Sequence, residues 1–176
     1  MLLRRARTDD HQAVVDLANL AYRGAEGSRG WNAESDVLEG ERINLAMLQR
    51  DLASSPNAHL LLYCDDEAGP VVGSVWLEPE PDAGDVWRLG LLSVHPGLQD
   101  RQLGRALLAA AEHFARDHGA QRIRMAVINV REPLIAWYAR RGYAPTGVVE
   151  PYPYGDDRYG RPLRDDLAFV ILEKRI

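Results

Sequence analysis

The residues from His95 to Gly119 join a short polar loop to a long helix-forming run, HPGLQDRQLGRALLAAAEHFARDHG. The first turn of a helix leaves backbone N–H groups without partners, and the helix dipole adds positive charge there. Such an end binds anions, above all phosphates. Gly104 allows close approach of a ligand, and Arg101 and Arg105 add positive charge. Taken alone, the stretch is equally consistent with a packing role in which Gly104 permits tight helix–strand contact.

Metal and nucleic-acid chemistry are not indicated. One cysteine, Cys64, and five dispersed histidines show no ligand spacing. His113 and His118 lie five residues apart, whereas a zinc-binding pair on a helix is spaced by four. The net charge of −5 lacks the broad positive field that nucleic-acid binders use. We therefore expect no metal and no nucleic-acid partner.

The composition indicates a single domain over residues 1–176. With 46% hydrophobic and 27% charged residues, the chain can bury a sizeable core. The N-terminal MLLRRARTDD has too few apolar residues for a signal peptide, and no run reaches the roughly 18 apolar residues of a membrane span. One cysteine cannot form an internal disulfide, which favours a reducing compartment. We expect a cytoplasmic protein without membrane contact.

The elements that position the loop follow from hydrophobic periodicity. Leu103, Leu107 and Phe114 recur on one face of the helix, as in a helix packed on a sheet. Thr8 is the expected N-cap of an earlier helix. Short turns between the preceding strands imply an antiparallel meander. Further helices are expected around Leu45, Leu48 and Leu52 and in EPLIAWYARRG. The expected strands are MLLRRART, AHLLLYCDD, PVVGSVWLEPEP, DVWRLGLLSVHP, RIRMAVINV, APTGVVE and DLAFVILEKRI.

Two stretches of the chain resemble signatures of the GNAT family of N-acetyltransferases. LLSVHPGLQDRQLGRALL is similar to the family's coenzyme A loop, in which V-x-P ends a strand and Q/R-x-x-G-x-G/A opens a helix. Gln99, Gly104 and Ala106 lie on or beside that pattern, but Gln102 occupies the first glycine position. INVREPLIAWYARRGY is similar to the second signature, a strand followed by a helix with an aromatic–Tyr pair and a terminal Gly-Tyr. The expected elements follow the family's order over nearly the whole chain.

The resemblance implies an α/β fold of the acyl-CoA N-acyltransferase type. A mixed, mostly antiparallel seven-stranded sheet is splayed between its fourth and fifth strands and flanked by about four helices. The pantetheine of acetyl-CoA lies in the cleft, beside a bulge in the fourth strand for which Gly90 is suited. Amides at the start of the helix cradle the pyrophosphate. The implied cofactor-binding residues are Leu92, Ser93, Val94, Gln99, Arg101, Gln102, Leu103, Gly104, Arg105 and Ala106, with Asn129 and Arg131 flanking the cleft.

The same resemblance implies direct transfer of an acetyl group from acetyl-CoA to a primary amine in one ternary complex. The acceptor is a small molecule or an exposed protein amine. Tyr138 matches the family tyrosine that reaches the cofactor sulfur and protonates the leaving thiolate. Arg141, three residues later, shares its helical face and can influence the phenol. Packing is the ordinary explanation of an aromatic pair such as Trp137–Tyr138, but the match of the whole segment favours the acid.

The general base is not defined by the sequence. Many relatives carry a glutamate near the middle of the fourth strand, but RLGLLSV has none, and Gly90 lies about where it would be. His95 is expected to be a turn residue rather than a proton acceptor. A water chain is an alternative to a side chain. The candidate carboxylates are Glu34, Glu78, Asp85 and Glu150.

Two irregular segments, Glu26–Glu41 and Pro151–Asp166, are expected to border the acceptor pocket, since the family places such loops opposite the cofactor. Their carboxylates can attract an ammonium group, although solvated charged loops are the simpler interpretation. The acidic residues of the second segment are Asp156, Asp157, Asp165 and Asp166.

Other functions stay open at this point. The missing strand carboxylate and Gln102 are compatible with a non-catalytic acyl-CoA-binding or regulatory module of the same fold. A bare nucleotide-binding domain is disfavoured, since the full glycine patterns of such domains are absent. The sequence leaves open the identity of the amine, the use of other acyl groups and the formation of a homodimer.

Overall fold

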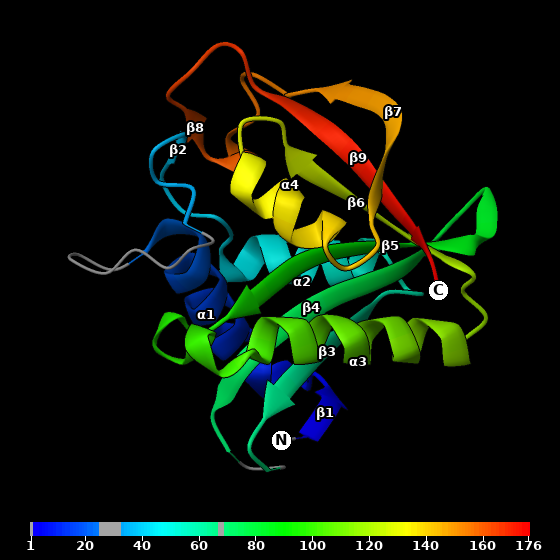
Figure 1. Ribbon diagram of the computed structural model, residues 1–176. Helices are drawn as coiled ribbons and strands as arrows, with labels where there is room; N and C mark the ends of the chain where they lie inside the picture. The colour runs from blue at the N-terminus through cyan, green and yellow to red at the C-terminus, as the bar shows by residue number, and fades with distance from the viewer. Residues whose placement is uncertain (1, 25–32, 67–68) are drawn as a thin grey trace.

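The computed structural model describes residues 2–24, 33–66 and 69–176 (Figure 1). Within them, one seven-stranded sheet is covered by four α-helices. The strands of this sheet are β1 (Leu2–Arg5), β3 (His59–Cys64), β4 (Val71–Glu80), β5 (Ala83–Val94), β6 (Arg122–Ile128), β7 (Ala144–Pro151) and β9 (Ala168–Arg175). The helices are α1 (His11–Arg23), α2 (Leu45–Ser54), α3 (Leu103–Asp117) and α4 (Glu132–Ala139). The fold class and the strands expected from the sequence are confirmed.

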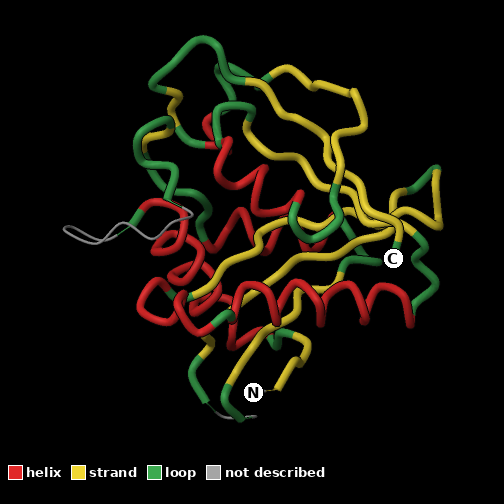
Figure 2. Tube along the Cα trace, viewed as in Figure 1, coloured by secondary structure: helices red, strands yellow, loops and turns green. Residues whose placement is uncertain are grey.

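The strand order is β1-β3-β4-β5-β6-β9-β7, and every pair is antiparallel except β5 with β6. That parallel pair is short. Val86–Arg88 pairs with Arg122–Arg124, and the two strands do not pair beyond these residues. Beyond this point the two strands diverge, as Figure 2 shows. The sheet is therefore splayed between its fourth and fifth strands, as the resemblance implied.

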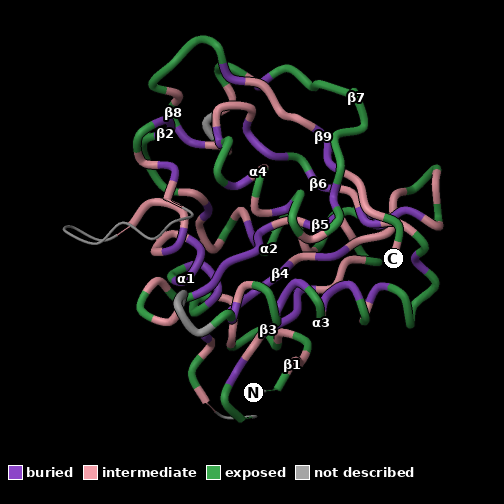
Figure 3. Tube along the Cα trace, viewed as in Figure 1, coloured by how far each residue is buried: buried purple, intermediate pink, exposed green. Residues whose placement is uncertain are grey.

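The two faces of the sheet carry separate apolar clusters. Leu107 and Leu108 of α3 and Leu134 of α4 pack with inward residues of β4, β5 and β6. On the other face, Val14 of α1 and Leu48 of α2 pack with residues of β3. Figure 3 shows these buried stretches and the exposure of β7 along its whole length. Edge strand β7 is thus left open to solvent on the side of the splay.

The fourth strand of the sheet, β5, contains the expected bulge, but not at the expected residue. Ser93 pairs with Ser74 and Gly90 with Trp76, so β5 holds one residue more than β4 in this interval. The left-handed backbone belongs to Leu91, at φ 49°, and not to Gly90. The Leu91 side chain is buried against the α1–α2 side of the sheet. This packing holds a non-glycine residue in a conformation that costs about 1 kcal/mol or more.

The start of α1 also differs from the expectation that Thr8 caps it. Thr8–Asp10 forms a 3₁₀ turn, and α1 begins at His11. The Asp10 carboxylate accepts the Arg7 backbone N–H at 2.7 Å and pairs with Arg4 at 2.7 Å. Asp10, and not Thr8, is therefore the N-cap residue of α1, and its side chain makes no cap bond to that helix.

A second, two-stranded sheet was not anticipated. Its strands are β2 (Leu38–Glu39) and β8 (Arg161–Pro162), from the two irregular segments. Gly160 precedes β8 at φ +87°, and a Cβ there would lie 2.8 Å from the Glu39 carbonyl oxygen. Only glycine allows this approach. In the described part of the chain, no helix has the length and apolar character needed to span a membrane.

Candidate functional site

A cavity of about 500 Å³ lies where β5 and β6 diverge. One wall is formed by Arg88–Leu92 of β5 and the other by Arg124–Ile128 of β6. Side chains from α1, α4, β7 and β9 complete it, together with the two irregular segments. A broken sheet leaves an opening between two strands whose backbones stay rigid, and a small molecule can enter there.

The end of β5 brings buried backbone to this cavity. Leu92 lines it, and the Leu92 carbonyl accepts the Tyr22 hydroxyl at 3.2 Å. The Ser93 hydroxyl donates to the Leu91 carbonyl at 3.3 Å within the bulge. Ser93 and Val94 are buried behind the cavity wall rather than on it. Sequence reasoning missed Tyr22, because nothing in the pattern of α1 marks a tyrosine that crosses to β5.

The start of α3 has the geometry of an anion site. Ala106 N–H donates to the Gln102 carbonyl at 3.0 Å, so the amides of Leu103, Gly104 and Arg105 have no intrahelical partner. Gln102, the N-cap, adopts left-handed φ 59° and makes no side-chain cap. The glycine position of the family pattern therefore requires a positive φ, which glutamine adopts here at a cost.

The rest of this segment lies around the same helix end. A Cβ on Gly104 would lie 3.6 Å from the Trp137 ring, which is an ordinary contact. Gln99 and Arg101 lie in the 3₁₀ helix Pro96–Arg101, and their side chains are outside what the structure describes. His95 accepts the Gly97 N–H at its own Nδ1, as expected of a turn residue.

Tyr138 lies on α4 and lines the cavity while being only 6% exposed. Its ring meets Trp137 and Tyr143 edge-on, with centroids 5.0 and 5.7 Å away. Burial raises the pKa of the phenol well above its ordinary value, and Tyr22 adds to the rise. Arg131 acts in the opposite direction. The hydroxyl is therefore a proton-bearing group throughout the physiological pH range.

The Arg141 side chain packs on Trp137 rather than on Tyr138. It lies past the end of α4, donates to the Trp137 carbonyl at 2.6 Å and stacks over the Trp137 ring at 3.5 Å. Burial lowers its pKa, with Arg140 and Arg105 acting in the same direction. Its effect on the phenol is to lower the pKa of Tyr138, so the predicted electrostatic influence exists.

A second hollow of about 430 Å³ carries an excess of positive charge beside the start of α3. Glu112 in it pairs with Lys174 at 2.7 Å and accepts the Tyr143 hydroxyl at 2.9 Å. The Arg141 Nε atom is buried without a hydrogen-bond partner in the described part of the chain. We call this hollow the basic groove. Its cations are Arg105, Arg140, Arg141 and Lys174.

The side chains of Asn129 and Arg131 are engaged with the protein itself. The Asn129 amide donates to the Asp166 carbonyl and accepts the Ala168 N–H, both at 3.0 Å. Arg131 is buried and lies 3.3 Å from Glu34. Asn129 therefore fixes the chain entering β9, and Arg131 anchors the first irregular segment. Their contact with the cofactor stays a prediction.

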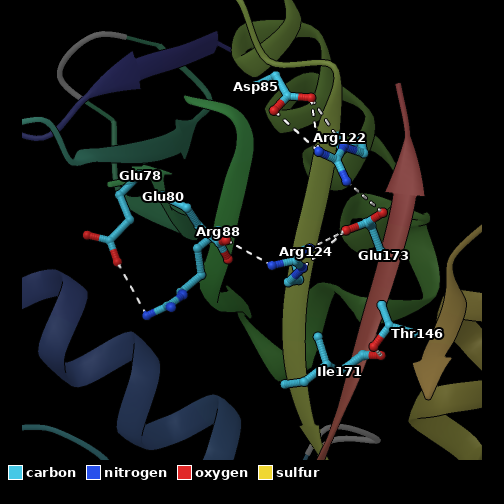
Figure 4. A network of polar contacts seen from close by, with 9 residues as sticks. All are labelled: Glu78, Glu80, Asp85, Arg88, Arg122, Arg124, Thr146, Ile171 and Glu173. Atoms are coloured by element: carbon cyan, nitrogen blue, oxygen red, sulfur yellow. Dashed lines mark hydrogen bonds and ion pairs between the residues drawn. The ribbon is translucent and has the colours of Figure 1, made fainter. Parts of the chain in front are cut away.

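The four candidate bases occupy different surroundings. Asp85 pairs with Arg122 at 3.1 Å at the closed end of the splay (Figure 4). Glu34 is buried against Arg23 at 2.9 Å. Glu78 is 4.0 Å from Arg88 and is not part of the cavity wall. Glu150 lines the cavity and has no ion pair among the described residues.

The closed end of the splay is held by charge as well as by strand pairing. Arg124 lies between Glu80, at 2.9 Å, and Glu173, at 2.7 Å (Figure 4). Glu80 and Arg124 both line the cavity, so this pair neutralises charge at its floor. The sequence did not reveal this network, because its members come from three strands that are distant along the chain.

The two irregular segments do border the cavity, through fewer residues than expected. Glu34 and Leu38 come from the first segment, and Tyr152 and Tyr159 from the second. Residues 26–32 lie outside the described residues, as does the Asp157 side chain. The three other predicted carboxylates lie outside the cavity wall. Asp156 pairs with Arg158, Asp166 pairs with Arg164, and Asp165 is exposed.

No metal-binding arrangement exists in the described ranges. No three histidine, cysteine, aspartate or glutamate side chains gather there as ligands would. His118 bonds the Phe114 carbonyl at 2.8 Å through Nδ1, and Cys64 is buried.

Comparisons with known proteins agree with this geometry. Mycothiol acetyltransferase of Beutenbergia cavernae is 35% identical over 94 residues, which cover 53% of this chain and 31% of that protein. Streptothricin acetyltransferase of Streptomyces lavendulae is 39% identical over 57 residues, covering 32% of this chain and 30% of that protein. The chain thus matches less than a third of the length of either relative.

Solved structures share the whole fold. The ribosomal-protein-alanine N-acetyltransferase from Brucella melitensis superposes with a TM-score of 0.71 and 19% identity, covering 100% of both chains. The model of the acetyltransferase (GNAT) family matches residues 13–143, which include the α3 loop and α4. This protein is therefore a member of the GNAT acetyltransferase family.

Proposed function

We propose that this protein is an N-acetyltransferase that moves an acetyl group from acetyl-CoA directly to a primary amine within one ternary complex. The acceptor is a small molecule or an exposed protein amine. The observation that carries the proposal is the cavity at the splay, which has Tyr138 in its wall and the start of α3 beside it. Gly104 at the start of α3 faces Trp137, which precedes Tyr138 in the chain, so the start of α3 lies close to this part of the cavity wall.

The residues present fit acetyl-CoA. The amides of Leu103, Gly104 and Arg105, which have no partner within α3, suit a pyrophosphate. The Arg141 Nε atom, without a hydrogen-bond partner among the described residues, suits a further phosphate in the basic groove. The backbone of Leu92, which lines the cavity beside the bulge, suits the pantetheine amides, and contacts of Ser93 and Val94 with the cofactor stay predictions. When bound, acetyl-CoA supplies a thioester whose carbonyl carbon accepts the amine while the C–S bond breaks.

The chain's own residues then handle protons and charge. The amine loses one proton, and the departing sulfur gains one, so the products are an amide and a thiol. A thiol has an ordinary pKa near 8.5, well below that of the buried phenol. Tyr138 therefore stabilises the developing thiolate mainly by donating a hydrogen bond, and a proton that it gives to the sulfur is replaced by the one that the amine releases, so the phenol is restored.

The non-catalytic alternative keeps one supporting observation. Gly90 lies on the β5 wall, so no carboxylate projects there from the middle of that strand. Thiol release from acetyl-CoA, measured with a panel of aliphatic amines, amino acids, polyamines and short peptides, separates the two functions. An enzyme accelerates release with at least one class. Binding of acetyl-CoA without amine-dependent release from any class would instead favour the binding module.

Hydrogen exchange tests the cofactor site independently of catalysis. Coenzyme A is expected to slow exchange at His95–Ala106, because bound phosphates order and occupy these amides. Calorimetry establishes saturation in the same samples. Unchanged exchange throughout this segment at saturation would reject the site.

Three other expectations stay proposals. We propose one domain over residues 1–176 and a location in the cytoplasm, which the single buried Cys64 supports. The oligomeric state is open, and a homodimer is compatible with the exposed β7 edge.

A further inference from the structure

The charges that line the cavity are not all balanced by the protein. Glu80 is paired with Arg124, and Glu34 with Arg23 and Arg131. Arg88 also lines the cavity and is paired with Glu78, at 4.0 Å. Arg42 and Glu150 also line the cavity, yet within the described residues neither side chain has an ion pair or a hydrogen bond. One cation and one anion of this cavity are thus left for a ligand.

Glu150 reaches the cavity from β7. Thr146, Val148 and Glu150 all line the cavity, although β7 is bulged between Pro145 and Val149, where Gly147 has φ +86°. Glu150 is solvent-exposed, so a ligand can reach its carboxylate. Tyr152, two residues further on, is in the wall as well.

Arg42 reaches the cavity from the segment after β2. Its backbone N–H donates to Asn19 Oδ1 at 2.6 Å, and its guanidinium lies 5.2 Å from the centre of the Tyr22 ring. Tyr22 also bonds the Leu92 carbonyl beside the bulge. The stacked ring holds the cation at the wall without neutralising it.

Tyr152 lies in the wall of the same cavity as the two charges. It directly follows β7, the strand that carries Glu150, and it is buried. Burial raises the pKa of Tyr152, and the charges of Arg23 and Arg42 work against this rise. Arg42, Glu150 and Tyr152 thus line one cavity.

A ligand with the complementary pair of charges gains most in such a region. It pairs both groups, whereas a ligand with one charge leaves either Arg42 or Glu150 partly desolvated without a partner. Tyr159 and Phe169 add aromatic surface for an apolar body.

We propose that the acceptor is a small zwitterionic amine of the amino-acid type, whose carboxylate binds Arg42 and whose ammonium binds Glu150. This inference rests on the proposed function and names its substrate class. It disfavours protein N-termini and polyamines, because neither carries a carboxylate beside the reacting amine. The aromatic wall favours acceptors with an apolar side chain.

The experiment compares each amine with and without its carboxylate. Thiol release from acetyl-CoA is measured with glycine, β-alanine, γ-aminobutyrate, leucine and phenylalanine, and with the carboxamide of each. For the best spacing, kcat/KM of the acid is expected to exceed that of the carboxamide by roughly 10-fold or more. Arg42→Gln should abolish this preference by slowing the acid alone, mainly through KM.

Two further variants complete the design. Glu150→Gln is expected to raise KM for acids and carboxamides alike, because both carry the ammonium. Arg50→Gln removes a charge of the same type from the exposed face of α2 and should change neither ratio. Coenzyme A affinity, measured by calorimetry, should be equal in all variants, which excludes misfolding.

The outcomes separate this inference from the proposed function. Turnover of carboxamides, polyamines or peptides at least as fast as of every acid would overturn the zwitterion and keep the acetyltransferase. A preference for acids that survives in Arg42→Gln would overturn the role of Arg42. Absence of thiol release with every amine, at saturating acetyl-CoA, would overturn both.

Discussion

The two strands that border the cavity are built in opposite ways. β6 pairs with β9 in unbroken register from Arg122 to Ile128, so its backbone groups are satisfied by a neighbouring strand. β5 loses register with β4 at Leu91, where the extra residue of the bulge leaves the ladder locally unpaired. A strand whose backbone groups are all paired can bind a ligand only through its side chains, whereas a bulged strand also has backbone groups available for a ligand.

This difference suits the two strands to different ligands. The bulged strand runs into the start of α3, and in the proposed function both present backbone to acetyl-CoA, a long ligand with amides and phosphates. The regular strand supports side chains, such as Arg124 and, through β9 and β7, Glu150, that suit a small charged acceptor. Changes at β5 and the start of α3 should therefore alter the affinity for coenzyme A, whereas changes on the side of β6, β9 and β7 should alter KM for the amine.

The largest effect is expected at Tyr138, which stands between the walls. Tyr138→Phe keeps the ring contacts and removes the hydroxyl, so turnover should fall roughly 10²-fold while acetyl-CoA affinity changes little. Because burial raises the pKa of this phenol above its ordinary value of 10, the hydroxyl keeps its proton as pH rises. The rate of the wild-type protein should show no alkaline loss from Tyr138 up to about pH 10.

Tyr143→Phe is the matched control. It removes the hydroxyl that donates to Glu112 at 2.9 Å, so stability should fall by about 1–3 kcal/mol with the chemical step intact. Single-turnover rates and thermal unfolding of both variants measure the contrast. An unchanged chemical step in Tyr138→Phe would remove Tyr138 as the acid.

The sequence could predict the elements around the proposed cofactor site, because each of them is local. Gly104, the following helix and the Trp137–Tyr138 pair are each contained in one short stretch, where helix periodicity and turn chemistry define the geometry. The position of the bulge was harder to predict. Gly90 is the permissive residue, but the strain falls on Leu91, since burial of its side chain outweighs the backbone cost.

The proposed acceptor site could not be predicted in the same way, because its residues come from distant segments. Arg42 and Glu150 are 108 positions apart, and nothing in either neighbourhood marks an unpaired charge. The candidate carboxylates differ from one another only in their ion-pair partners, and those partners come from other elements of the fold. Asp85 meets Arg122 and Glu34 meets Arg23, while Glu150 meets no arginine in the described chain.

A smaller effect, confined to the proposed cofactor site, is expected from Gly104→Ala. The added methyl has room in the folded protein, 3.6 Å from Trp137, and alanine favours a helix by about 1 kcal/mol over glycine. Stability should therefore hold or rise, while a phosphate close to the backbone is pushed away. Affinity for coenzyme A should fall roughly 10-fold, with little change in KM for the amine.

Gly84→Ala serves as the control for that variant. Nothing lies within 4 Å of a Cβ at Gly84, which is on the turn side of β5 and away from the cavity. Calorimetric affinity for coenzyme A should be unaffected there. Equal affinities in Gly104→Ala and the parent would contradict close approach of the ligand to this backbone.

The smallest effect is expected at Gln102, where the family pattern has glycine. Its φ of 59° is easy for glycine, costs glutamine about 1 kcal/mol and is worst for a β-branched residue. Gln102→Gly should therefore unfold at an equal or higher temperature and bind coenzyme A at least as tightly as the parent. Gln102→Val should lose about 1–2 kcal/mol of stability and some affinity, since relieving its strain displaces the first amides of α3. Thermal unfolding and calorimetry of the pair measure both properties. A valine variant as stable as the glycine variant would show that the backbone at residue 102 is not held in the left-handed region. Leu91 would then be the one non-glycine residue of the described chain with that conformation.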